Sequence, residues 1–169
     1  NSCRGLLKQM NVVKLCTTED PTDQLPYHQQ LHNSDCEIKV STAFRPDKAV
    51  LIDSENYTAY LDKLGEAAGL EIGNYGQLKE ALKKRIDYFH KMGCRLCDHG
   101  LNSMSFETFS DQEIEQIFSK KRNGENLSAL EVEKFKTAIL LFLCETYHEK
   151  GWVQQFHLGA LRNNNKRML

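Results

Sequence analysis

Ionisable and hydrogen-bonding residues recur in this sequence directly after four short apolar segments. They form the groups TTED at 17–20, FRPD at 44–47, DHG at 98–100 and HLG at 157–159, and Arg162 and three asparagines from Asn163 follow the last group. If the apolar segments are parallel strands, their carboxyl ends meet at one edge of the sheet, where α/β folds place their active sites. The sequence therefore predicts one site built from all four segments.

Taken one at a time, these residues also suit structural roles. Glu19 and Asp20 could cap a helix, and Arg45 could be a surface cation. Asp98 and His99 could form an internal ion pair, His157 could lie in the core, and the asparagines could form a turn. A strand-end arginine beside an aromatic residue also suits the binding of a carboxylate. The shared position of all four groups favours a functional site.

The bulk composition is that of one globular domain. The chain has 169 residues, of which 40% are hydrophobic and 27% are charged, and its net charge is -1. A protein that mainly binds nucleic acid would carry a basic excess, and no apolar run approaches the ~18 residues of a membrane span. No signal peptide is visible either. We therefore expect a cytoplasmic protein with no nucleic-acid or membrane partner.

The six cysteines are expected to be reduced thiols, because the chain is long enough for a core and shows no signal for secretion. Cys94 and Cys97 form a C-x-x-C pair. A redox pair belongs at a helix N-terminus, and a zinc site needs further ligands. Here the pair begins an expected strand, which favours buried structural thiols.

The order of expected elements is that of an α/β protein. Strands are expected at 11–20, 37–47, 94–100 and from Trp152 onward, with helices between them, and this alternation indicates a parallel sheet. The near-continuous apolarity of the first strand suggests burial on both faces. Capping boxes that begin at Ser110 and Ser128 predict the starts of two helices. Four strands do not close a barrel of about eight, so residues 1–169 are expected to be a single partial domain.

Five segments resemble, in the same order, those of bacterial uronate isomerases, also called glucuronate isomerases: GLLKQMNV, CTTEDPTDQLPYH, FRPDKA, GCRLCDHGL and GWVQQFHLGALRNNNKRM. The resemblance extends over essentially the whole chain, although Glu19 stands where the family more often has aspartate and Cys97 where it often has serine. It implies part of a (β/α)8 TIM barrel of the amidohydrolase superfamily. The family's His-x-His metal motif and its late catalytic aspartate are absent, so the chain is expected to be the middle section of the barrel.

The resemblance implies interconversion of D-glucuronate with D-fructuronate and of D-galacturonate with D-tagaturonate. Such a reaction needs a base, a group that stabilises an oxyanion and a clamp for the distal carboxylate. The catalytic candidates are His157 and Asp98, and the substrate-binding candidates are Arg45, His99, Arg162 and Asn163. The resemblance also implies a divalent metal, with zinc expected, and its ligands are expected mainly outside this chain.

Two other functions remain open from the sequence. The superfamily mostly hydrolyses its substrates, so a metal-dependent hydrolase is one alternative. The other is a catalytically inactive fragment that only packs or associates with itself, and a homo-oligomer is therefore also open. The expected partner of the intact protein is a small-molecule uronate.

Overall fold

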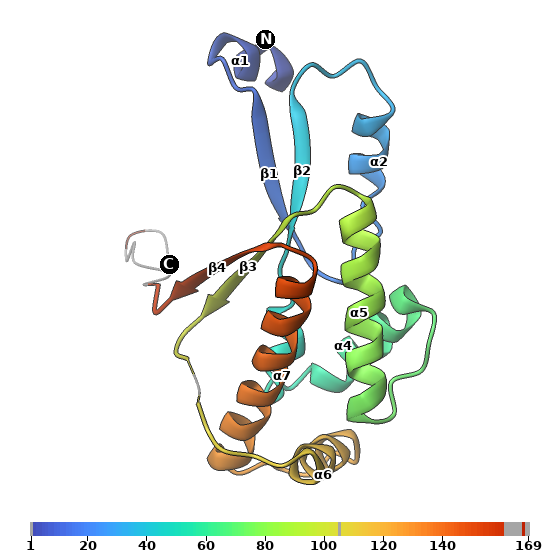
Figure 1. Ribbon diagram of the computed structural model, residues 1–169, viewed down its shortest axis with the longest axis vertical. Helices are drawn as coiled ribbons and strands as arrows, with labels where there is room; N and C mark the ends of the chain where they lie inside the picture. Colours follow the sequence, from blue (N-terminus) through green and yellow to red (C-terminus); the bar gives the residue numbers. More distant parts are fainter. Residues whose placement is uncertain (1, 105, 161–166, 168–169) are drawn as a thin grey trace.

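The computed structural model describes residues 2–104, 106–160 and 167. In this part of the chain, one parallel sheet has the order β1-β2-β3-β4 and consists of β1 (Lys14–Glu19), β2 (Lys39–Phe44), β3 (Leu96–Leu101) and β4 (Val153–Leu158) (Figure 1). The α/β class and the four parallel strands, predicted as part of a (β/α)8 barrel, are confirmed.

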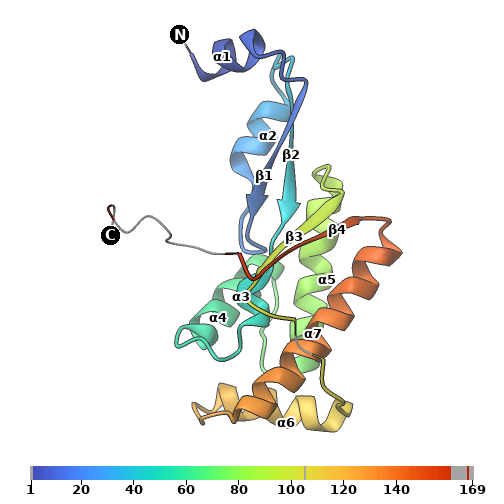
Figure 2. The ribbon, with the colours of Figure 1, turned by 90° about the vertical axis from the view of Figure 1, so that its left-hand side faces the viewer.

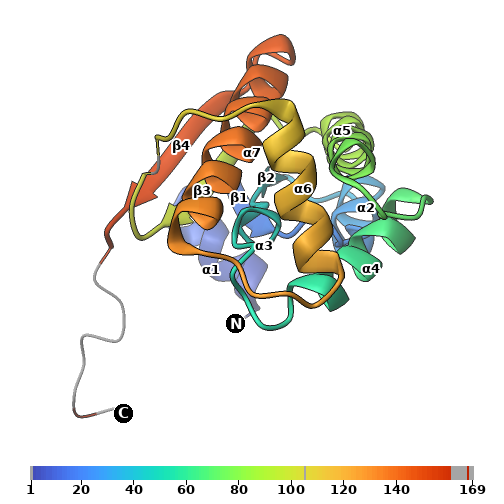
Figure 3. The ribbon, with the colours of Figure 1, turned by 90° about the horizontal axis from the view of Figure 1, so that it is seen from below.

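The helices between the strands are α1 (Cys3–Gln9), α2 (Pro26–His32), α3 (Asp47–Val50), α4 (Tyr57–Ala68), α5 (Tyr75–Lys91), α6 (Asp111–Arg122) and α7 (Ala129–Glu149). Helices α5 and α7 run side by side, and α6 crosses their lower ends (Figures 1 and 3). The predicted capping boxes at Ser110 and Ser128 are both formed and begin α6 and α7. Within the described residues, no helix is long and apolar enough to cross a membrane.

The hydrophobic core lies between the sheet and the helices. Its centre is a group of buried aromatic side chains, in which the ring of Phe44 meets those of Phe89, Tyr147 and Trp152 edge to face. Such edge-to-face pairs stabilise a core by more than the burial of their surface area alone would. Because Phe44 is the last residue of β2, this packing fixes the carboxyl end of that strand.

The opposite face of the sheet is not covered by the described helices, and in Figure 2 the strands lie in front of α2 and α5. Along β1 and β4, exposed residues therefore alternate with half-buried ones over most of each strand. Val13, just before β1, is exposed as well. The prediction that the first strand is buried on both faces is therefore wrong for this chain, because β1 lies at the edge of the sheet and helices pack on only one of its faces.

The sheet consists of two strand pairs joined at one position. Strands β1 and β2 are paired along their whole length, and so are β3 and β4. Between β2 and β3, the register contains only the pair Phe44 and Cys97. The next residues along these two strands are Arg45 and Asp98, so the register places these two predicted site residues side by side.

Candidate functional site

Asp98 is the centre of the polar cluster at the carboxyl ends of the strands. Its side chain is only 8% exposed. The guanidinium of Arg45 contacts it twice: Nη2 forms an ion pair with Oδ2, and Nε donates to the backbone carbonyl of Asp98 at 3.0 Å. A charged donor at this position compensates for the burial of the carboxylate.

Residues of the two flanking strands complete this cluster. Thr18 of β1 donates its hydroxyl to Asp98 Oδ2 at 3.1 Å. On β4, Nδ1 of His157 lies 2.8 Å from Asp98 Oδ1. The side chains of Arg45 and His157 are 32% and 47% exposed, so both can be reached from solvent while Asp98 is held beneath them. All four strands therefore contribute to one constellation of a carboxylate, an imidazole, a hydroxyl and a guanidinium.

His99 is fully buried and belongs to a second, largely buried cluster on the other face of the sheet. Successive residues of a strand point to opposite faces, so His99 points toward the helices while Asp98 points away from them. Nδ1 of His99 lies 3.0 Å from Asp47 Oδ1, and Nε2 lies 3.3 Å from the hydroxyl of Tyr147. The ring also stacks on that of Phe156, with centroids 5.0 Å apart. The ion pair of Asp98 with His99 that the sequence left open is therefore not formed.

The donors and acceptors of this second cluster follow from its geometry. An ionised carboxylate only accepts hydrogen bonds, so Nδ1 of His99 donates to Asp47. Burial raises the pKa of Tyr147 well above its usual value, which keeps its hydroxyl protonated. With Nδ1 as the donor to Asp47, Nε2 of His99 is left to accept a hydrogen bond from the Tyr147 hydroxyl at 3.3 Å, and both ring nitrogens have partners within the chain.

The remaining strand-end residues have other roles or lie outside the described residues. Asp20 Oδ1 accepts hydrogen bonds from the amide and the hydroxyl of Thr22, at 3.0 and 2.8 Å, and so closes a turn. It does not cap α2, whose N-cap residue is Leu25 and which has no side-chain cap bond. Glu19 lies 4.0 Å from Nε2 of His28. Arg162 and Asn163, both predicted to bind substrate, fall outside the described residues.

Comparison with known proteins assigns the family. The family model described as glucuronate isomerase matches residues 1–169. The chain belongs to the glucuronate isomerase family. It is 53% identical over 167 residues to a uronate isomerase of Flavobacterium johnsoniae and 46% identical over 169 residues to one of Shouchella clausii. These alignments include 99% of this chain but 36% of each relative, so the chain spans about a third of the length of the glucuronate isomerases that it matches.

Solved structures of the family have the same fold over nearly all of this chain. The uronate isomerase of Thermotoga maritima superposes with a TM-score of 0.91 at 29% identity and covers 97% of this chain and 36% of its own. The glucuronate isomerase of Caulobacter crescentus gives a TM-score of 0.86 at 28% identity, over 96% of this chain and 34% of its own. The four parallel strands therefore correspond to a section of the glucuronate isomerase fold.

Three of the six candidate residues in this member of the family meet at one point: Arg45, Asp98 and His157. His99 has no exposed side-chain surface, so a direct contact with substrate stays a prediction that this arrangement does not support. Sequence reasoning did not select Thr18 or Asp47, although both belong to strand-end groups. It had no signal for Tyr147, which reaches His99 in the second cluster from its place in α7.

Metal and thiol chemistry can be assessed for the described residues. Among them, no group of three or more histidine, cysteine or carboxylate side chains could hold a metal ion. Burial raises the pKa of Cys94 to about 11 and that of Cys97 to about 12. Both thiols are free and buried, as the structural interpretation of the C-x-x-C pair predicts, and at neutral pH neither is a reactive thiolate.

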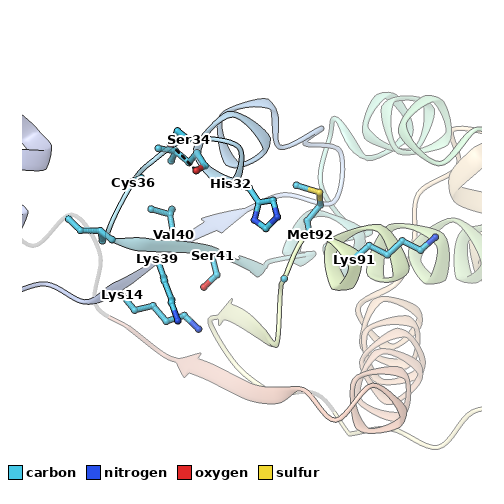
Figure 4. Close-up of a pocket in the computed structure, with 12 residues that line it drawn as sticks. Lys14, His32, Ser34, Cys36, Lys39, Val40, Ser41, Lys91 and Met92 are labelled. Carbon is cyan, nitrogen blue, oxygen red and sulfur yellow. Dashed lines mark hydrogen bonds between the residues drawn. The ribbon is translucent and has the colours of Figure 1, made fainter.

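A cavity of about 410 Å³ lies at the amino ends of β1 and β2, away from the strand-end cluster (Figure 4). Lys14 and Lys39, which are direct partners in the register of β1 and β2, extend to the same side of it. His32 from α2 and Met92, which follows α5, border it as well. None of the four candidate site residues that the structure describes lines this cavity.

Proposed function

We propose that the protein containing this chain is a uronate isomerase that interconverts D-glucuronate with D-fructuronate and D-galacturonate with D-tagaturonate. In this proposal the chain is the middle section of a (β/α)8 barrel and supplies part of the active-site wall. The observation that carries the proposal is the convergence of Arg45, Asp98 and His157 at the carboxyl ends of the strands, in a chain that belongs to the glucuronate isomerase family.

The chemistry of the cluster suits an aldose–ketose isomerisation. This reaction moves a proton between neighbouring carbons through an enediol-like state, while a proton also moves between the two oxygens. Nδ1 of His157 lies 2.8 Å from Asp98 Oδ1, an oxygen with no hydrogen bond in this arrangement, so the two groups are placed to hold or relay such a proton, and His157 is the more exposed partner. Arg45 can bind the distal carboxylate or a hydroxyl of the sugar with the part of its guanidinium that Asp98 does not use.

The remaining roles lie at the edge of the described residues or beyond them. Arg162 and Asn163 would shape the loop over the substrate. A divalent metal, zinc in our proposal, would stabilise the developing oxyanion. The described residues do not by themselves fit such an ion, because Asp98 is engaged by Arg45 and Thr18, and His99 is enclosed. Its ligands would therefore lie mainly in the rest of the protein, which would be cytoplasmic and bind neither nucleic acid nor membranes.

The test is to incubate the full-length protein with D-glucuronate and with D-galacturonate and to follow ketouronate formation by NMR. D-glucose and D-galactose are matched controls, because they differ from the uronates only in having a hydroxymethyl group in place of the distal carboxylate. Conversion of at least one uronate, with much slower conversion of the neutral sugars, is the expected result. Absence of ketouronate from both reactions would overturn the proposal, and hydrolysis of a uronate ester or amide in its place would favour the metal-dependent hydrolase.

A further inference from the structure

Asp47 joins the two halves of the sheet at the point where their backbone pairing stops. It is the first residue of α3 and follows Arg45 and Pro46 at the exit of β2. Its carboxylate reaches across to β3, where Oδ2 accepts the backbone amide of Gly100 at 2.8 Å and Oδ1 meets Nδ1 of His99 at 3.0 Å. The side chain is largely buried.

These contacts take the place of a backbone ladder. Strands β2 and β3 share only the pair Phe44 and Cys97. Beyond that pair, β3 is held to the exit of β2 by the bond from Arg45 Nε to the Asp98 carbonyl and by the bonds that Asp47 accepts. Arg45 Nε also lies 3.9 Å from Asp47 Oδ2, so the same carboxylate attracts the guanidinium that holds Asp98.

Both residues that Asp47 contacts are neighbours of the cluster that carries the proposed chemistry. His99 directly follows Asp98 in β3, and Gly100 is the register partner of His157 in β4. A shift of β3 at Gly100 therefore moves Asp98 relative to Arg45 and moves His157 with it. Misplacement of a catalytic group by about 1 Å can reduce a rate by about a hundredfold.

We propose that Asp47 is a positioning residue: it fixes the end of β3 so that Asp98 stays aligned between Arg45 and His157. This inference rests on the proposed function of the cluster for its effect on catalysis. Asp47 does not itself need to meet the substrate, because its two oxygens are occupied by His99 and Gly100.

The test compares Asp47→Ala and Asp47→Asn with the wild type in the full-length protein. Alanine removes both hydrogen bonds and the charge. Asparagine keeps the shape but removes the charge, and it can serve both partners only if His99 reverses its tautomer. We expect kcat to fall by at least about tenfold in the alanine variant and by less in the asparagine variant, while KM stays within about threefold of the wild type.

Thr137→Val is the control for general destabilisation. Thr137 is buried in α7, where its hydroxyl donates to the carbonyl of Glu133 and accepts the amide of Glu107, and these bonds do not involve the cluster. This variant should lower Tm and leave kcat within about twofold of the wild type below its unfolding transition. A kcat in Asp47→Ala within about threefold of the wild type, or an equal loss in Thr137→Val, would overturn the inference.

Hydrogen exchange separates this inference from the proposed function. In Asp47→Ala, the amides of residues 98–101 should exchange faster than in the wild type and in Thr137→Val, because the bond to the Gly100 amide is lost. If the wild-type protein turns over no uronate, the proposed function fails, but this measurement still tests whether Asp47 holds β3. Unchanged exchange at residues 98–101 would overturn the inference whatever the activity.

Discussion

Replacing Arg45 with alanine is the most informative single perturbation of the strand-end cluster. The substitution removes the ion pair with Asp98 Oδ2 and the 3.0 Å bond from Nε to the Asp98 carbonyl. Asp98 then keeps Thr18 and His157 as its only neighbours from the cluster, although its carboxylate remains almost buried. Without its cation, the buried carboxylate of Asp98 is expected to change position or to accept a hydrogen bond from another group.

The magnitude follows from the charged hydrogen bonds that are lost. A hydrogen bond to a charged group contributes about 1.5–3 kcal/mol, and each ~1.4 kcal/mol of transition-state stabilisation is about tenfold in rate. Arg45→Ala should therefore lower kcat/KM of the full-length protein for glucuronate by about 10- to 150-fold. Arg45→Lys keeps the charge but loses the planar fork that reaches two acceptors, so an intermediate loss is expected.

The assay is steady-state turnover of glucuronate, with circular dichroism to show that each variant is folded. A loss that falls mainly on KM would identify Arg45 as the clamp for the substrate carboxylate, whereas a loss in kcat would identify it as the group that aligns Asp98. Arg95→Ala is the matched control, because Arg95 donates to the carbonyls of His90 and Cys94 at the other end of β3. A folded Arg45→Ala variant with unchanged efficiency would place Arg45 outside the active site and refute this reasoning.

Three further predictions concern the isolated chain, its thiols and one ion pair. Residues 1–169 alone, with zinc or manganese added, should turn over uronates more than about a hundredfold more slowly than the full-length protein, a difference of ~2.7 kcal/mol, because β1 and β4 are unpaired edges; faster turnover would show that the chain holds a complete site. Since burial raises the pKa of Cys94 to about 11 and that of Cys97 to about 12, neither thiol should be alkylated by iodoacetamide at pH 8 before denaturant is added, and mass spectrometry that finds early adducts would contradict this. Hydrogen bonds from Lys120 and from the helix cap hold the pKa of Glu131 at about 2, below its usual 4.5, so the stabilisation is complete above pH 4.5 and is lost as the pH falls toward 2. Glu131→Gln should therefore cost about 0.5–1 kcal/mol in urea unfolding at pH 7 and less at pH 3, and an equal cost at both pH values would contradict the assignment.

Local signals in the sequence were sufficient for most of the secondary structure. The capping boxes at Ser110 and Ser128 depend on residues three positions apart, and both begin helices as predicted. Helix α3 was missed because its four residues are too few to show a helical period and it follows Pro46 directly. The burial of the first strand was predicted wrongly because apolarity alone does not say whether a strand lies at the centre or at the edge of a sheet.

The candidate site could be predicted in position but not in its contacts. The recurrence of polar residues at strand ends correctly brought Arg45, Asp98 and His157 to one edge of the sheet. The twofold period of a strand already implies that Asp98 and His99 face opposite sides, so this signal was available in the sequence. The partners Asp47 and Tyr147 were not, because they depend on the register of β2 with β3 and on the packing of α7.

The join between the two strand pairs brings structural contacts and the proposed chemistry to neighbouring residues. Only the pair Phe44 and Cys97 links β2 and β3 by backbone register, so the connection beyond it depends on the side chains of Arg45 and Asp47. A connection through side chains requires charged groups at the strand ends. A longer backbone ladder between β2 and β3 would not have required them. The same groups therefore keep the two halves of the sheet in register and present Asp98 and His157 at the surface. It follows that kinetic losses from substitutions here must be compared with variants of equal stability, since Arg45 both holds β3 and belongs to the proposed active site.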